Sequence, residues 1–149
     1  MKKRFTQFST KATKISRGLF LTLFAVAIFS CNMENKLDGT TWKSSSFEQT
    51  NPVGTYTHNI DLDFSGNAVS VNHKIVFKYN NSASPSFTTE IPYIGTFSCD
   101  KKDITISAKG ATWNGTVDKK TMTLDISIPR DDAAGLEAVS VQGVTFSKQ

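Results

Sequence analysis

Hydrophobic and polar residues alternate with a period of two along most of the chain, from Leu37 to the end. Glycine, asparagine, aspartate, serine and proline interrupt this alternation every 8–15 residues. Two-residue alternation indicates strands that bury one face. No segment after Cys31 has a convincing helical period. Short strands between regular turns are typical of an all-β sandwich or barrel, so the pattern predicts an all-β domain.

The best-defined pair of predicted strands covers residues 55–64 and 68–79. Gly66-Asn67 lies between them and favours a two-residue hairpin turn. That turn pairs His58 with Ile75 and Ile60 with His73, and it places the apolar residues of both strands on the same side. Register and hydrophobic pattern therefore agree. The inward residues are Tyr56, His58, Ile60, Leu62 and Phe64 in the first strand, and Val69, Val71, His73, Ile75, Phe77 and Tyr79 in the second.

Seven further strands are predicted, and short turns join most of them. We expect Pro92 to interrupt or bend the chain, and we expect a bulge near Gly143. Asn114-Gly115 could be a hairpin turn, but we prefer a continuous strand. Eight or nine such strands predict an antiparallel up-and-down barrel of about eight strands, because closure removes exposed edges. The seven strands are residues 40–47, 86–91, 93–99, 103–107, 111–117, 121–128 and 138–147.

The N-terminal segment has the pattern of a secretory signal peptide. Residues 1–18 contain six lysines and arginines and no acidic residue, and the apolar run Leu19–Phe29 follows. This run of 11 residues is shorter than the roughly 20 that a membrane-spanning helix needs. It ends in Phe29-Ser30-Cys31, which resembles the lipobox of bacterial lipoproteins. The resemblance implies cleavage before Cys31 and acylation of its thiol and amine; an ordinary secreted protein cut elsewhere is the alternative.

This interpretation divides the chain into a signal peptide (1–30), a lipidated Cys31 with a short tether (31–38) and a barrel domain (39–149). Three acyl chains would hold the protein stably on a membrane. In lipoproteins of some Gram-negative bacteria, an aspartate directly after the acylated cysteine is associated with retention in the inner membrane. Asn32 follows Cys31 here, so the resemblance implies a lipid anchor in the outer membrane of the cell envelope. A dense acidic run after the cysteine would resemble a surface-export tag of the Bacteroidales. Only Glu34 is acidic in the next five residues here, so the resemblance implies the periplasmic face over the cell surface. The extended tether spans at most roughly 25 Å.

Three short motifs resemble a known family. Leu37-Asp38-Gly39-Thr40-Thr41-Trp42 opens the domain, Gly95-Thr96-Phe97 lies in mid-chain, and Trp113-Asn114-Gly115-Thr116-Val117 precedes an alternating strand. Together they resemble the lipocalin-like, or calycin-like, β-barrel lipoproteins of the Bacteroidales over residues 37–147. The second and third motifs also resemble each other, because each leads into an Asp-Lys-Lys turn, as successive hairpins of a meander do. The family resemblance implies a barrel with a ligand in its interior.

The net charge and the cysteine count exclude some functions. The whole chain has a formal charge of +4, but six of its 17 basic residues lie in the signal peptide, so the rest carries 11 basic and 13 acidic residues. The basic charge of the whole chain therefore comes from the signal peptide and does not argue for a nucleic-acid partner, which would need a clustered basic face. If Cys31 is acylated, Cys99 is the only other cysteine and no disulfide within the chain is possible.

The candidate site consists of large or polar residues on inward faces. The only histidines, His58 and His73, would be diagonal neighbours that could share a polar ligand group. No third metal ligand, nucleophile elbow or phosphate loop is apparent, so we expect no metal, no cofactor and no enzyme. We predict a small apolar ligand in the barrel interior; the alternative is a filled barrel that acts as an interaction, accessory or inhibitor protein in an envelope complex. The expected ligand-binding residues are Tyr56, His58, His73, Phe77 and Trp113.

Overall fold

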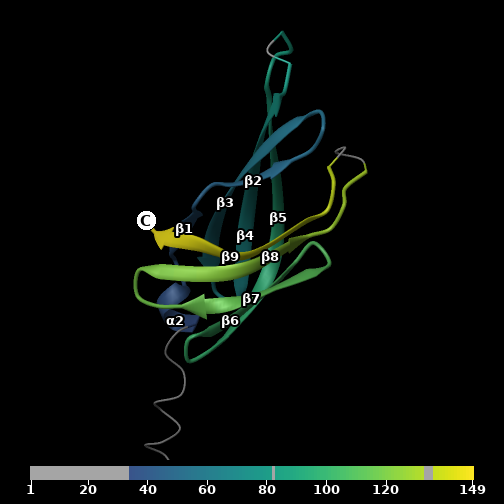
Figure 1. Ribbon diagram of the computed structural model, residues 1–149. Helices are drawn as coiled ribbons and strands as arrows, with labels where there is room; N and C mark the ends of the chain where they lie inside the picture. Colours follow the sequence, from purple (N-terminus) through teal and green to yellow (C-terminus); the bar gives the residue numbers. More distant parts are fainter. Residues whose placement is uncertain (1–33, 82, 133–135) are drawn as a thin grey trace, which may run out of the picture. The chain divides into compact units, whose positions relative to one another are not determined.

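The computed structural model describes residues 34–81, 83–132 and 136–149. The segment Asn32–Gln149 forms a compact unit of its own, and its described residues form a closed antiparallel β-barrel with one short helix (Figure 1). The predicted all-β barrel of about eight strands is confirmed. The predicted signal peptide and Cys31 lie outside the described residues. The elements are α2 (Glu34–Leu37), β1 (Thr41–Ser44), β2 (Phe47–Thr50), β3 (Gly54–Ser65), β4 (Ala68–Tyr79), β5 (Phe87–Asp100), β6 (Asp103–Ala108), β7 (Ala111–Val117), β8 (Thr121–Ile128) and β9 (Val139–Lys148).

The barrel closes through its first strand. From β3 to β9 each strand pairs with the next one in sequence, and β1 pairs with both β3 and β9. The prediction of a single strand over residues 40–47 is wrong, because the chain breaks between β1 and β2. At the break the Ser44 hydroxyl accepts a hydrogen bond from the Ile60 amide at 2.8 Å, so a side chain replaces a backbone partner. Beyond it, β2 continues the first strand and pairs with β3 alone.

The predicted hairpin of β3 and β4 is confirmed in register; the bounds of β4 are as predicted, and β3 is one residue longer at each end. His58 pairs with Ile75 and Ile60 pairs with His73. The predicted bulge in β9 is confirmed as well: the register of β8 and β9 shifts between Leu124 and Ile126. Gly143 has a φ of +69° there, and its amide donates a hydrogen bond to the Asp125 carboxylate at 2.9 Å. A positive φ is the conformation that glycine adopts without steric cost.

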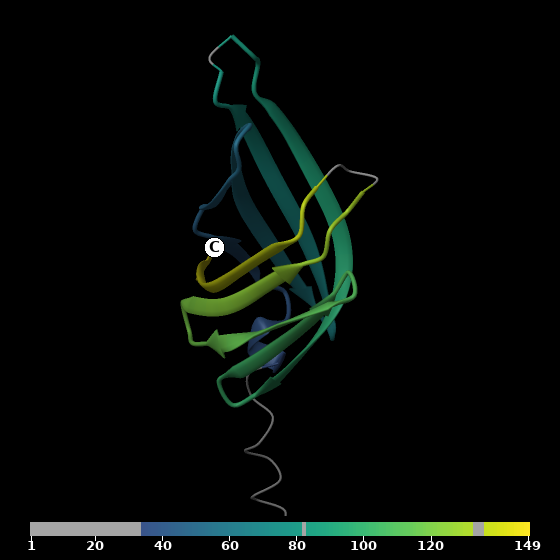
Figure 2. The same ribbon diagram turned by 45° about the vertical axis from the view of Figure 1, so that its right-hand side comes forward.

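Residues 87–100 form one continuous strand, so the expected interruption at Pro92 is wrong. Pro92 pairs with Asn72 of β4 on one side. On the other side β6 pairs with β5 only from Gly95 onward, so the missing N–H of Pro92 lies on an edge where no ladder needs it. The hairpin of β4 and β5 extends beyond the other strands, at the top in both ribbon views (Figures 1 and 2). Among the described residues, no helix is both long and apolar enough to cross a bilayer.

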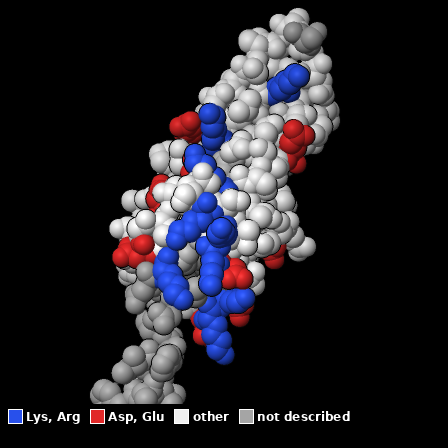
Figure 3. All heavy atoms as spheres, turned by 90° about the vertical axis from the view of Figure 1, so that its left-hand side faces the viewer, with Lys and Arg blue, Asp and Glu red and all other residues white. Residues whose placement is uncertain are grey.

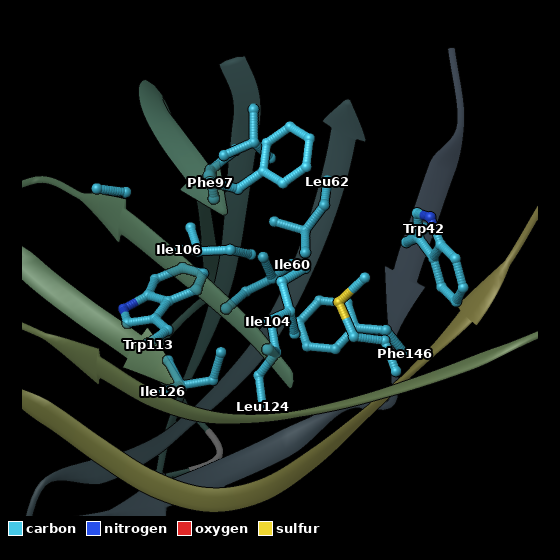
Figure 4. Packing of buried hydrophobic residues seen from close by; sticks show 14 of the residues in the cluster. Trp42, Ile60, Leu62, Phe97, Ile104, Ile106, Trp113, Leu124, Ile126 and Phe146 are labelled. Carbon is cyan, nitrogen blue, oxygen red and sulfur yellow. The ribbon is translucent and has the colours of Figure 1, made fainter. Parts of the chain in front are cut away.

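Large apolar side chains fill the interior of the barrel (Figure 4). Trp42 and Trp113 are each 1% exposed and Phe146 is fully buried. The polar end of each tryptophan is satisfied: Trp42 Nε1 donates to the Thr40 hydroxyl at 2.8 Å, and Trp113 Nε1 donates to the Ser127 carbonyl at 2.6 Å. Buried aromatic side chains of this kind contribute strongly to stability. The barrel therefore has a solid hydrophobic core.

Candidate functional site

The candidate site is a pair of buried histidines on adjacent strands. His58 lies on β3 and His73 on β4, and their side chains face the barrel interior at the diagonal positions that the sequence predicts. His58 Nδ1 and His73 Nε2 are 2.9 Å apart, which is hydrogen-bond distance. They are 2% and 1% exposed, among residues that are otherwise apolar. The structure thus brings the two predicted polar residues into direct contact.

Aromatic rings hold His58 in place. The Phe47 ring lies parallel to the His58 ring at 5.0 Å, with an angle of 7° between the planes. The centre of the Tyr56 ring lies 6.3 Å from that of His58, and the hydrogen-bonded His73 ring lies edge to edge with His58, with ring centres 5.1 Å apart and 20° between the planes. Phe47 was not among the predicted site residues, because it reaches His58 only through the separate strand β2. The parallel contact with Phe47 and the hydrogen bond to His73 hold the ring orientation and so determine where its second nitrogen points.

Both histidines are neutral at pH 7. Burial lowers the pKa of each from 6.5 to about 4, and for His73 the nearby His58 and Lys109 lower the pKa further. In a hydrogen bond between two neutral imidazoles, one ring nitrogen donates and the other accepts. In either tautomer His58 Nε2 is left buried and without a hydrogen-bond partner. Such a group costs roughly 1–3 kcal/mol unless a partner satisfies it.

The histidine pair borders a small cavity, about 10 Å³ in volume. Tyr56 and Ile75 line it beside the histidines, and Ile128 and Val139 close it from the connection between β8 and β9. A single water molecule needs roughly 10–15 Å³, whereas pockets for small molecules measure roughly 300–1,000 Å³. The cavity has room for about one water molecule beside the histidines, and for nothing larger.

An ion pair ties the β8–β9 connection to the barrel above this cavity. Lys109, in the turn between β6 and β7, contacts Asp131 at 2.5 Å, and both side chains are about three-quarters buried. Asp131 also exchanges two backbone hydrogen bonds with Leu136, each 2.9 Å long. The Lys109 ammonium lies 5.9 Å from the centre of the Tyr93 ring. Sequence reasoning missed this pair, because a turn lysine and a loop aspartate 22 residues apart form no local pattern.

The predicted ligand-binding residues separate into two groups. Tyr56, His58 and His73 line the cavity. Phe77 does not line it; its ring packs on Tyr56 at 4.4 Å and on Phe87 at 5.2 Å, toward the end of the β4–β5 hairpin. Trp113 lies in the filled core. Half-buried Tyr93, which was not predicted, packs on Trp113 at 6.4 Å; its hydroxyl has no hydrogen-bond partner, and burial raises its pKa well above the usual range.

In residues 34–149, apart from the four that the structure does not describe, no three His, Cys, Asp or Glu side chains are grouped so that they could hold a metal ion.

Comparison of the chain with models of protein families, with curated proteins and with solved structures finds no significant match. The functional argument therefore depends on the site and the surface of this chain.

Proposed function

We propose that this chain is a lipid-anchored protein of the bacterial cell envelope whose filled β-barrel acts through its surface, as an interaction or accessory protein without catalytic activity. The basic leader, the short apolar run and Cys31 support the anchor. With the barrel, they support a place among the lipocalin-like lipoproteins of the Bacteroidales. The anchor would lie in the outer membrane and the barrel on its periplasmic face.

The observation that carries this proposal is the filled interior. Ile60, Leu124 and Phe146 are fully buried in the middle of the barrel, and the cavity at the histidine pair has a volume of about 10 Å³. A drug-sized ligand needs at least about 30 times that volume. A barrel packed in this way supports a role for its outer surface over a role as a ligand container.

One surface fits a protein partner in particular. The half of β5 from Phe87 to Ile94 pairs with β4 on one side, and no described strand pairs with its other edge. Ile94 is 76% exposed and Phe87 is 45% exposed. An unpaired strand edge can take up an extended segment of another protein, which adds a strand to the sheet. We assign the partner to this edge.

A small polar-headed ligand at the histidine pair is the second candidate. The observation that favours it is the buried His58 Nε2, which has no partner in the protein and borders the cavity. A hydrogen-bonding group on such a ligand would satisfy this nitrogen, while Tyr56 and Ile75 would contact its apolar part. Binding would require the β8–β9 connection to move outward, because the present cavity is too small.

Ligand uptake by the purified unit Asn32–Gln149 separates the two candidates. We expect native mass spectrometry to give the mass of the polypeptide alone. We also expect that the protein does not increase the fluorescence of a hydrophobic dye. Leu124→Ala is the positive control, because an apolar cavity of this kind binds benzene and should give a thermal shift with it. A co-purifying molecule that His58→Phe releases would contradict the filled-barrel proposal and support the ligand.

A further inference from the structure

A second hollow lies at the end of the barrel opposite the β4–β5 hairpin. Its volume is about 490 Å³, far larger than that of the cavity beside the histidines. Its floor includes the buried residues Leu37, Trp42 and Val117. Figure 3 shows basic side chains gathered on one face of the molecule. The charged residues that line the hollow, here called the lysine pocket, are Lys36, Lys101, Lys102, Lys119, Lys148 and Asp118.

The fold brings these lysines together from four separate segments. Helix α2, the β5–β6 turn, the β7–β8 turn and the end of β9 meet at this end of the barrel. Backbone hydrogen bonds connect them: the Val117 amide donates to the Lys102 carbonyl at 2.7 Å, and the Lys148 amide donates to the Lys120 carbonyl at 3.1 Å. The lysine pocket is therefore fixed by the barrel itself and does not depend on one flexible loop.

The concentration of positive charge here is not a consequence of overall composition. The chain after the predicted cleavage site has more acidic than basic residues, yet five of its ten lysines line this one pocket. The Asp118 carboxylate forms an ion pair with the Lys102 ammonium at 3.3 Å and so offsets one of the five positive charges. The Lys119 amide and Lys102 hold the pKa of Asp118 below its usual range. Within the described residues, Lys101, Lys119 and Lys148 form no ion pair.

The lysine pocket also lies at the N-terminal end of the described chain, which is the end that the proposed anchor precedes. Lys36 and Leu37, at the beginning of the described chain, belong to its lining. Cys31 precedes Glu34 by three residues, and three residues span at most about 11 Å in any conformation. If Cys31 carries the acyl chains, the lysine pocket is held within reach of the phospholipid headgroups.

We propose that the lysine pocket binds the phosphate groups of anionic phospholipids in the bilayer that carries the anchor. This inference rests on the proposed lipid anchor for its geometry, but it adds the ligand and the orientation. Ammonium groups donate charge-assisted hydrogen bonds to phosphate oxygens, and a negatively charged leaflet attracts basic clusters within about one Debye length. Docking of this end would turn the β4–β5 hairpin away from the bilayer and leave the β5 edge open to partners.

Vesicle binding by the unit Asn32–Gln149 tests the proposal. This unit has a compact core of its own and lacks Cys31, so its binding does not depend on acylation. We expect it to co-sediment with phosphatidylcholine vesicles that contain phosphatidylglycerol, and not with vesicles of phosphatidylcholine alone. Raising the salt concentration should release it, because exposed charges are screened.

A pair of matched variants locates the binding surface. Lys119→Gln with Lys148→Gln should weaken binding to the anionic vesicles on the order of 30-fold, since each lysine near a charged surface contributes about fivefold. The control Lys74→Gln with Lys78→Gln makes the same charge change at exposed positions of β4 and should leave binding unchanged. Thermal melts confirm that both variants fold.

Three results would overturn the lysine pocket as a membrane site. They are equal binding to both kinds of vesicle, equal losses in both variants, and tight binding of glycerol 3-phosphate in solution without binding to vesicles. The last result would indicate a soluble phosphate compound as the ligand. None of them bears on Cys31, whose acylation is measured separately, so failure of the anchor and failure of the lysine pocket are distinguishable.

Discussion

At the scale of single residues, the histidine pair differs most from its surroundings. His58 and His73 replace apolar residues at positions where the barrel interior is otherwise hydrophobic. Each imidazole must give up hydration, and only one hydrogen bond between them, at 2.9 Å, compensates. The pair therefore costs the folded state more when it is charged than when it is neutral.

Stability should fall in acid because of this pair. The pKa of both histidines is about 4 in the folded protein and 6.5 when the chain is unfolded. Because the pKa is lower in the folded protein, the unfolded chain takes up protons at a higher pH than the folded protein does. The contribution of the neutral histidines to stability is therefore complete above pH 6.5 and is lost as the pH falls through 4. The loss should be on the order of 3 kcal/mol per histidine. Urea denaturation between pH 7.5 and 4 measures it.

The double variant His58→Leu with His73→Leu is the control for this titration. It removes both partners of the hydrogen bond and leaves apolar side chains of similar size, which is expected to be neutral or stabilising at pH 7. Its stability should change much less between pH 7 and pH 4. If the double variant loses as much stability in acid as the native chain, carboxylates elsewhere are responsible and the histidines are not.

At the scale of elements, two glycines let neighbouring strands approach closely. A Cβ on Gly115 would lie 1.9 Å from the Thr123 carbonyl oxygen of β8, and a Cβ on Gly95 would lie 2.5 Å from the Ser107 carbonyl oxygen of β6. These glycines occupy equivalent places in the two similar motifs, Gly95-Thr96-Phe97 and Gly115-Thr116-Val117. Glycine within a strand often marks such an approach, which helps the sheet curve into a barrel.

Gly115→Ala should therefore destabilise the barrel by about 1–3 kcal/mol, because the atoms it meets are backbone and cannot swing away. Thr112→Ala is the control on the same strand: Thr112 is exposed, and its loss should change stability by less than about 0.5 kcal/mol. Thermal or urea denaturation compares the two. If Gly115→Ala and the native chain had the same free energy of unfolding, β7 and β8 could move apart to admit the methyl group without loss of stability, which would contradict this prediction.

The elements also show how far the sequence could predict this fold. The bounds of β4, β7 and β8 follow from alternation between turn signals, which are local features. The break between β1 and β2 depends on a Ser44 hydroxyl that meets a distant amide, and the continuity of β5 through Pro92 depends on a missing neighbour. Neither the break nor the continuity can be predicted from local sequence. The same reason explains the site: the hairpin register predicted that the histidines are diagonal neighbours, but nothing predicted their direct hydrogen bond or the Phe47 stack.

At the scale of the whole barrel, the two ends differ in chemistry. The end that includes α2 has the lysine pocket, whereas the opposite end has the β4–β5 hairpin with exposed Phe87 and the unpaired edge of β5. A filled barrel with two unlike ends suits a protein that stands on one surface and presents the other. This arrangement gives the proposed anchor a direction, because the chain enters at the lysine end.

The anchor itself is tested at Cys31. The full chain, expressed in a Gram-negative host with labelled palmitate, should incorporate the label and sediment with the membrane fraction. Cys31→Ser should lose the label completely, because the lipobox places the cysteine at position 31 for transfer of the diacylglyceryl group, and the protein should move to the soluble fraction or stay uncleaved. Cys99→Ser, at the other cysteine, is the matched control and should keep the label. A native chain without label would mean that Phe29-Ser30-Cys31 is not a lipobox and that the protein is exported free; the barrel would then reach membranes only through its lysine pocket, which alone would hold it weakly and reversibly.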